Sequence, residues 1–194
     1  MKNYRVLLAA VLCLSFACRQ KDKDKEDGKK FISVPSLVEK QVAHVDTSLY
    51  MIIKIVTTDS LHSDTSYILR EDFRAAAKEF LEIPDLSDKK LAKRFIEEPA
   101  RYDEQLNRVI ISYTPVRPEK EEYKNLELTV TPDVDTSENV KNVIVTRIIR
   151  NRDSLLQKNM LWIMDRSFLI TTISQKPGQP EKTTTTKVTW NEDN

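Results

Sequence analysis

Residues 140–174 read VKNVIVTRIIRNRDSLLQKNMLWIMDRSFLITTIS, and this stretch decides the fold. Residues 140–150 are rich in β-branched side chains, which favour strands. Residues 155–164 and 166–174 continue the pattern, either as two strands or as one long bent strand. The stretch therefore predicts consecutive β-strands that pair with one another.

Further strands are expected on both sides of this stretch. Residues 109–114 and 126–131 alternate apolar and polar side chains, which is the period of a strand with one buried face. Residues 176–179 (KPGQ) have the composition of a type II turn, and residues 183–190 follow as a closing strand. Leu49 to Thr58 is apolar on both faces, which predicts a well-buried strand. Because the loops are short, we expect neighbouring strands to pair antiparallel.

Helices are expected in the first half of the chain. Residues 36–39 have the composition of a capping box that opens a short helix. The apolar face of this helix would consist of Val38, Val42 and Val45. Residues 67–84 carry apolar side chains at helical spacing, and their final proline would end that helix. Ser87 is expected to cap another helix, which Pro99 would end, and the polar residues 59–66 are interpreted as a loop.

These elements together predict an α+β fold. An N-terminal helix and strand would be followed by two helices that pack on one face of a mostly antiparallel, curved sheet of about six to seven strands. We expect residues 31–194 to form this single α+β domain.

The first residues form a targeting segment. Lys2 and Arg5 give a positive start, and residues 6–17 are almost wholly apolar. This run is shorter than the stretch of about 20 apolar residues that a helix needs to cross a bilayer. A positive start, a short apolar run and a small residue before a cut are typical of a secretory signal peptide. We therefore expect residues 1–17 to be a signal peptide.

The end of this segment, Ser15-Phe16-Ala17-Cys18, resembles the lipobox of bacterial lipoproteins. It departs from that pattern because Leu14 stands four places before the cysteine instead of three, and because Phe16 is bulky where a small residue is usual. The resemblance implies that the Cys18 sulfur carries a diacylglycerol and that Cys18 becomes the first residue. Two or more acyl chains anchor a protein stably to a membrane. The implied location is the outer membrane, on its periplasmic side or at the cell surface, with membrane lipid as a partner.

The residues that follow the cysteine are expected to be a tether. Residues 19–30 (RQKDKDKEDGKK) offer nothing to bury, so residues 18–30 should stay disordered. The tract also resembles the charged export signals of surface lipoproteins of the Bacteroidota, while Arg19 directly after Cys18 resembles lipoproteins released to the outer membrane. A plain solvated spacer is the alternative, and both interpretations stay open.

The charge of the chain limits its partners. Loss of residues 1–17 would leave 177 of the 194 residues, and removal of Lys2 and Arg5 would leave 29 of the 31 basic residues against 30 acidic ones. The net charge would then be −1. Such a balance gives no electrostatic attraction to nucleic acid, so we expect no nucleic-acid partner.

Cysteine and glycine usage excludes several classes of site. Cys13 would leave with the signal and Cys18 would be lipidated, so no disulfide and no cysteine-bound metal is expected. The chain holds only two glycines, Gly28 and Gly178. A phosphate-binding loop, a dinucleotide-binding fingerprint and a Gly-x-Ser-x-Gly elbow each need several glycines within one short motif, because their backbones turn sharply or approach phosphate closely, and Gly28 lies in the expected tether.

Two histidine clusters are candidate sites. Asp59, His62 and Asp64 have the residue types of a metal site, although a catalytic metal needs three ligands and an open position. Residues 44–48 (HVDTS) have the residue types of a hydrolytic triad, but neighbours in sequence do not have triad geometry. We prefer a solvated loop for the first cluster. For the second we prefer a helix end, where His44 lies near the negative pole of the helix dipole.

Charged pairs and a basic patch are further candidates. Adjacent acids can serve glycoside hydrolysis only across a cleft, so we interpret them as solvent-facing charge. These pairs are Glu71-Asp72, Glu97-Glu98 and Glu121-Glu122. Trp162 and four arginines could form a basic and aromatic surface, although the end of a hairpin is the preferred interpretation. These arginines are Arg147, Arg150, Arg152 and Arg166.

Taken together, these patterns predict a protein without enzymatic activity. Met160, Trp162 and Met164 alternate on one strand face, which favours a core position over a ligand-facing concave surface. We expect no catalytic residue, no cofactor and no metal, and a binding or structural role with an envelope protein, a glycan or an apolar ligand as partner. The alternatives are a periplasmic carrier or chaperone for a lipid or apolar ligand, and a hydrolase that uses His44 or His62.

Overall fold

The strands expected in residues 140–174 are present in the computed structural model, which describes residues 31–58, 62–132 and 139–191. β7 (Val140–Asn151) pairs with β8 (Ser154–Ile163), and β8 pairs with β9 (Ser167–Gln175). A turn at Asp165, where φ is +58°, separates β8 from β9, so this region forms two strands and not one bent strand. β10 (Lys182–Thr189) then pairs with β9.

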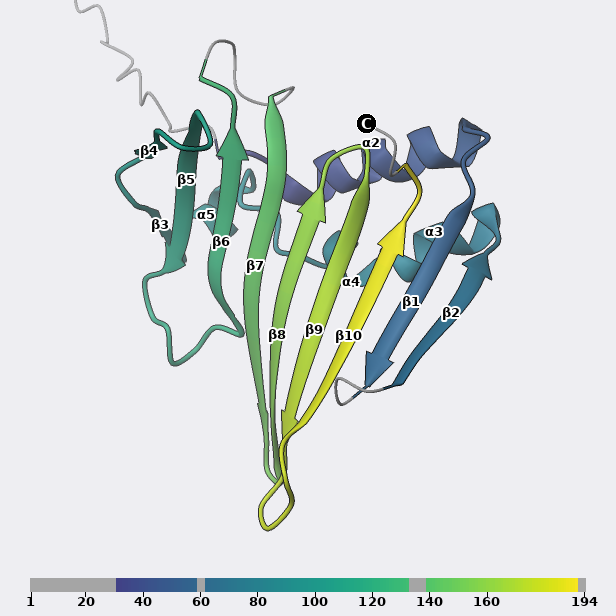
Figure 1. The fold of residues 1–194 in the computed structure, drawn as a ribbon. Helices are drawn as coiled ribbons and strands as arrows, with labels where there is room; N and C mark the ends of the chain where they lie inside the picture. Colours follow the sequence, from purple (N-terminus) through teal and green to yellow (C-terminus); the bar gives the residue numbers. More distant parts are fainter. Residues whose placement is uncertain (1–30, 59–61, 133–138, 192–194) are drawn as a thin grey trace, which may run out of the picture. The chain divides into compact units, whose positions relative to one another are not determined.

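These four strands form the middle of a ten-stranded sheet, all of whose pairs are antiparallel (Figure 1). On one side of them, β10 pairs with β1, and β1 pairs with β2. On the other side, β7 pairs with β6, β6 with β5, and β5 with both β3 and β4. The bounds of these strands are β1 Ile52–Thr58, β2 His62–Ile68, β3 Phe95–Glu97, β4 Arg101–Asp103, β5 Arg108–Pro115 and β6 Tyr123–Val130.

The prediction of an α+β fold with six to seven strands is wrong, because the described chain is mostly an open, curved β-sheet with few and short helices. Three strands account for the difference. β2 covers residues 62–66 of the segment interpreted as a polar loop and residues 67–68 of the expected helix, and nearly all of its side chains are exposed, so it has no apolar pattern. β3 and β4 have three residues each, which is too short to show a period of two.

The first helix, α2 (Val34–Thr47), begins earlier than its sequence pattern predicts. Ser33 is its N-cap, and the Ser33 hydroxyl accepts a hydrogen bond from the backbone N–H of Ser36 at 3.3 Å. The prediction of a capping box that starts at Ser36 is therefore wrong. The expected apolar face is confirmed, since Val38, Val42 and Val45 are fully buried.

The long helix expected within residues 67–84 is divided at Ala77 into α3 (Arg70–Ala76) and α4 (Lys78–Leu81). The helix expected after Ser87 is only the short α5 (Lys89–Ala92), which Asp88 caps through hydrogen bonds from two backbone N–H groups. Phe95 belongs to β3 and lies opposite Pro115 of β5. Phe95 is therefore part of a strand, and the prediction that it belongs to the helix between Ser87 and Pro99 is wrong.

The core lies where α2, α3 and α4 cover one face of the sheet (Figure 1). Phe73 of α3 and Phe80 of α4 contact Trp162, Phe168 and Trp190 from the sheet side. The Phe80–Trp162 and Phe73–Trp190 rings meet edge to face, each pair at a centroid distance of 5.0 Å. Such contacts stabilise aromatic pairs beyond the burial of their area. The core interpretation of Trp162 is confirmed.

Two side-chain contacts fix α2 to the rest of the fold. The Gln41 amide nitrogen donates to the Asp165 carboxylate at 2.8 Å, and the Asp165 backbone N–H donates to the Gln41 amide oxygen at 2.6 Å. Arg74 of α3 donates two hydrogen bonds to the Glu39 carboxylate, at 2.7 and 2.9 Å. The helix is thus joined both to the β8–β9 turn and to α3.

Candidate functional site: a pocket at the shared end of two hairpins

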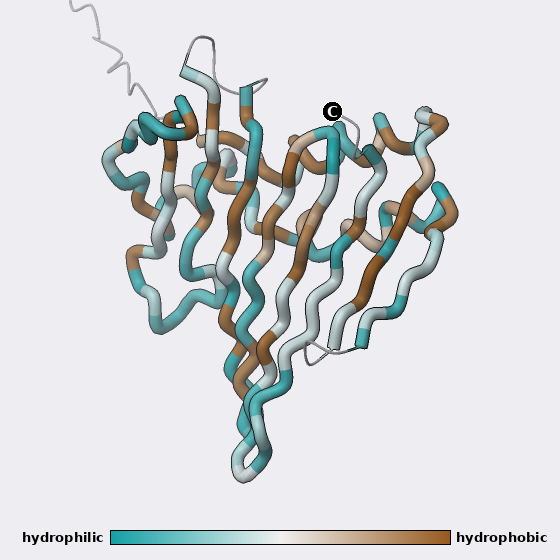
Figure 2. Tube along the Cα trace, in the orientation of Figure 1, coloured by the Kyte–Doolittle hydropathy of each residue, from teal (hydrophilic) through white to brown (hydrophobic). Residues whose placement is uncertain are grey.

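The four central strands continue past the helices to a common end, where the β7–β8 turn lies near the connection from β9 to β10 (Figure 1). The helices cover one face of the sheet as far as Lys158 of β8, whose ammonium group donates a hydrogen bond to Glu79 of α4 at 2.5 Å. Figure 2 shows that hydrophobic segments continue along β7 and β8 beyond this level, while the turns at the end are hydrophilic. We call this uncovered region, residues 148–157 and 173–184, the hairpin end.

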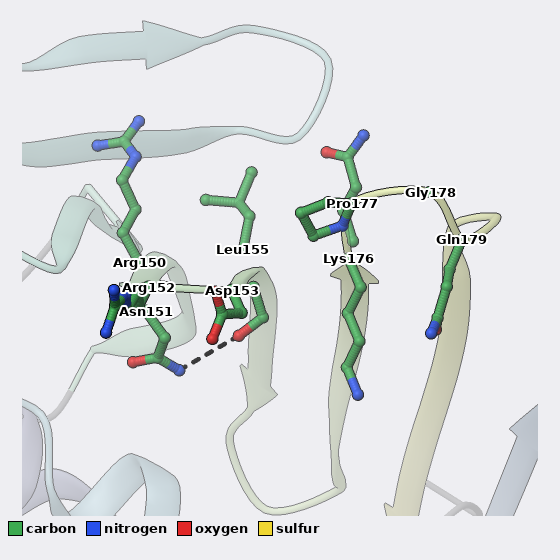
Figure 3. A pocket seen from close by; sticks show the side chains of 11 residues that line it. Arg150, Asn151, Arg152, Asp153, Leu155, Lys176, Pro177, Gly178 and Gln179 are labelled. Carbon is green, nitrogen blue, oxygen red and sulfur yellow. Dashed lines mark hydrogen bonds between the residues drawn. The ribbon is translucent and has the colours of Figure 1, made fainter.

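A pocket of about 500 Å³ lies at the tip of the hairpin end (Figure 3). Residues 150–155 from one hairpin and residues 175–179 from the other line it. Strand register places Leu155 opposite both Arg150 and Gln175. Arg150 and Leu155 extend to one side of the strands in Figure 3, whereas Lys176 and Gln179 extend to the other side.

Local turn chemistry shapes both walls of the pocket. Gly178 has a φ of +71°, and the Gln179 backbone N–H donates to the Lys176 carbonyl at 3.1 Å. These are the features of a type II turn with glycine in its third position, so the predicted turn is confirmed. In the opposite wall, the Asn151 amide donates to the Ser154 hydroxyl at 3.4 Å across the β7–β8 turn.

The pocket is positively charged. Arg150, Arg152 and Lys176 line it with one acidic residue, Asp153. Within the described residues, no salt bridge or hydrogen bond joins any of these three cationic groups to an acceptor, and all three residues are exposed. Their charges are therefore free to meet an anionic partner.

This charge contrasts with the rest of the unit. Eight of the 31 basic and four of the 30 acidic residues precede Phe31, which leaves 23 basic and 26 acidic residues in 31–194 and a net charge of −3. Farther along β7, Arg147 donates to Glu122 at 2.9 and 2.6 Å. Burial lowers the pKa of Arg147 and is the largest single effect, but the hydrogen bonds to Glu122 and the charge interactions with Tyr123, Glu122 and Glu79 together outweigh it, so the pKa lies above its usual value. The charge of Arg147 is thus balanced by Glu122, whereas the cationic groups at the tip have no such ion pair among the described residues.

The structure brings together only part of the predicted basic and aromatic patch. Arg150 and Arg152 lie at the β7–β8 turn, so the preferred interpretation as a hairpin end is confirmed for them. Arg147 is paired with Glu122, and Arg166 lies at the β8–β9 turn, at the opposite end of β8. Trp162 is fully buried and presents no ring to a ligand.

Sequence reasoning missed the second wall of the pocket. Gln175, Lys176 and Gln179 follow β9, and no local pattern indicates that the end of β9 reaches the β7–β8 turn. The available signal is strand length, because β8 and β9 have similar lengths on either side of their shared turn. Paired strands of similar length bring their far ends together.

The two histidine clusters do not form catalytic sites in the described structure. His44 is exposed near the end of α2, and the Ser48 hydroxyl donates to the Val45 carbonyl at 2.8 Å, so the preferred interpretation as a helix end is confirmed. His62 and Asp64 lie on the exposed strand β2, and Asp59 lies outside the described residues. Among the described residues, no group of three side chains could hold a metal ion.

The acid pairs do not converge on a cleft. Glu121 accepts hydrogen bonds from Arg94, one of them at 2.8 Å, while its neighbour Glu122 pairs with Arg147. Glu98 accepts from the Thr114 hydroxyl at 2.7 Å. Glu71-Asp72 lies exposed in the first turn of α3, where negative charge favours the helix. Adjacent acids thus serve separate structural contacts.

Glu97 lies near Tyr113, whose side chain is 1% exposed. Burial raises the pKa of Tyr113 to about 12, and the negative charge of Glu97 adds to this effect, while a backbone hydrogen bond at Ile32 opposes it. Tyr113 is therefore a buried neutral group at ordinary pH, and its surroundings stabilise the fold without offering a reactive site.

The targeting predictions concern residues that the structure does not describe. The signal peptide 1–17, Cys18 and the tether 18–30 all lie outside the described residues. None of the helices within the described ranges has the length and the hydropathy that a bilayer span requires. No protein-family model, curated protein or solved structure matches this chain.

Proposed function

We propose that this protein is a non-enzymatic binding protein of the cell envelope, anchored at the outer membrane through lipid on Cys18, and that the hairpin end is its binding surface. The observation that carries the proposal is the tip pocket, where three cationic side chains that form no ion pair with any described residue line one projecting site. The motif at residues 15–18 supports the anchor.

The geometry favours binding over catalysis. The candidate nucleophiles, bases and acid pairs lie apart, and the pocket itself holds no histidine or cysteine and only one acidic residue. Its arginines and amide side chains can donate hydrogen bonds to several charged or polar groups of a partner. A hydrolase that uses His44 or His62 gains no support from their exposed, separate positions.

The carrier hypothesis stays a prediction. A carrier needs apolar space for its ligand, yet the Phe73, Phe80 and Trp162 rings fill the region between helices and sheet. An apolar ligand would have to lie elsewhere, on the uncovered face of the sheet. We therefore rank this function below binding at the hairpin end.

The anchor is tested in cells. A signal peptidase II inhibitor should cause the uncut precursor to accumulate, and Cys18→Ser should produce the same larger species without the inhibitor. An unchanged mass under both conditions would contradict lipid anchoring. Protease treatment of intact cells, followed by detection of the C-terminal strand, then distinguishes a surface position from a periplasmic one.

The binding surface is tested by photo-crosslinking of the full chain in cells. A crosslinking residue at Gln179, in the tip pocket, should give discrete adducts with envelope components. The same residue at Lys89, an exposed position of α5, is the matched control. Equal adducts at both positions, or none at Gln179, would contradict the assignment of the hairpin end as the binding surface.

A further inference from the structure

The hairpin end carries an uncompensated charge that indicates what it binds. We propose that its tip docks on the anionic headgroups of a lipid surface. This inference rests on the proposed function, because it names the partner of the same binding surface. It follows from the direction of the cationic side chains, from the residues between them and from the charge of the rest of the unit.

The cationic groups point in different directions. In Figure 3, Arg150 extends to one side of the strands and Lys176 to the other, while Arg152 projects from the turn between β7 and β8. A single small anion cannot contact groups that point apart in this way. A layer of headgroups can, because each cation then meets a separate phosphate, and guanidinium groups bind phosphate through paired hydrogen bonds.

Apolar groups lie between these cations. Leu155 is half-buried beside Arg150, and the exposed Pro177 lies in the opposite turn. Both belong to the lining of the same pocket. A tip that combines basic side chains with apolar ones fits the boundary between phosphates and acyl chains. A purely polar polymer would leave Leu155 and Pro177 without a matching contact.

The charge of the unit would orient it on such a surface. Residues 31–194 carry a net charge of −3, whereas the residues that line the tip pocket carry three positive charges and one negative charge. An anionic surface therefore repels most of the unit and attracts the tip. The attraction extends about one Debye length, roughly 8 Å at physiological ionic strength, so it acts on the projecting end.

The test is vesicle flotation with residues 31–194, which hold every described helix and strand and the whole described core. One set of vesicles contains phosphatidylcholine alone, and the other contains phosphatidylcholine with about one third phosphatidylglycerol. We expect binding to the anionic vesicles only, and loss of that binding at high salt. Omission of the tether removes its own basic residues from the measurement.

Matched variants locate the contact. Arg150→Gln with Arg152→Gln should lower partitioning to anionic vesicles by roughly 25-fold, since each basic residue near such a surface contributes about fivefold. Lys89→Gln with Lys90→Gln removes the same charge from exposed positions of α5 and should change it by less than about twofold. Unchanged circular dichroism spectra would show that both variants are folded.

The possible outcomes separate this inference from the proposed function. No binding to anionic vesicles, or equal losses in the two double variants, would overturn the lipid assignment. Tip-dependent binding to a soluble acidic polysaccharide without vesicle binding would also overturn it, while the hairpin end would remain the binding surface. Absence of crosslinked adducts at Gln179 would instead contradict the proposed function, and the inference depends on that function.

Discussion

Phe80 offers the sharpest test of how the helices are held on the sheet. Its side chain is fully buried, and its ring contacts Trp162 at 5.0 Å and Phe168 at 5.5 Å. Phe80→Ala removes a whole ring from a packed core, which typically costs about 3–5 kcal/mol of unfolding free energy. We expect the upper half of that range, because two aromatic contacts are lost together with the buried area.

The matched control is Phe31→Ala, which removes the same atoms from a half-buried side chain with one ring contact, to Tyr113 at 5.2 Å. We expect this control to cost less than half as much as Phe80→Ala. Urea unfolding followed by far-ultraviolet circular dichroism measures both. This signal avoids direct effects on the tryptophan fluorescence, since Trp162 lies next to Phe80.

The reasoning fails if Phe80→Ala costs less than about 1 kcal/mol, or no more than Phe31→Ala. Such a result would mean that α4 does not pack on the sheet as described, and that removal of the Phe80 ring creates no new cavity in a packed core. The space between helices and sheet would then be open to a ligand, and this result would support the carrier hypothesis. An unchanged slope of free energy against urea would confirm that both variants unfold from the same compact state.

Three further predictions concern single positions. The raised pKa of Tyr113 favours its neutral form in the folded state, so the stability that it contributes should persist below about pH 10 and fall, by about 2 kcal/mol, as pH rises toward 12. Tyr113→Phe should flatten that fall in urea titrations across this range, and an equally steep fall in the variant would refute the assignment. Ser33→Ala should cost about 1 kcal/mol through loss of the N-cap of α2, measured by thermal unfolding, whereas Ser33→Asp should retain the cap. Gly178→Ala should cost about 1 kcal/mol from its positive φ alone, because no atom of the described residues lies within 4 Å of the added Cβ; Gly178→Asn should cost less, and equal costs would contradict this cause.

The central strands could be predicted from the sequence because each buries one face. Val143 and Val145 of β7 lie opposite Trp162 and Met160 of β8, and all four are buried on the same side. The alternation in sequence is the direct record of that burial. The pairing of the strands within residues 140–174 could therefore be predicted, and only the structure shows that the turn at Asp165 divides residues 154–175 into two strands.

The edges of the sheet could not be predicted in the same way. β2 gains its stability from hydrogen bonds to β1, and its own side chains stay in solvent, so no hydrophobic signal marks it. Phe95 is apolar at a spacing that fits a helix, yet the three residues of β3 pair with β5. Local pattern cannot distinguish these cases, because the partner strand lies elsewhere in the chain.

Only one wall of the candidate site could be predicted from the sequence. Arg150 and Arg152 flank a turn that the sequence marks with polar residues between two apolar runs, so a basic hairpin end could be expected. Lys176 reaches the same pocket only because β8 and β9 lie side by side along their whole length. Ion pairs could not be predicted from the sequence either, since Arg147 pairs with Glu122, which is distant along the chain.

The position of β10 fixes the order in which this fold can be completed. β10 lies between β9 and β1, and Ile53 of β1, the first strand along the chain, is opposite Thr189 of β10, the last described strand. The β1–β2 hairpin therefore has no further strand to pair with until residues 182–189 have been synthesised. A chain that lacks residues 182–189 would therefore lose the strand that joins the β1–β2 hairpin to the rest of the sheet, and not an outer edge.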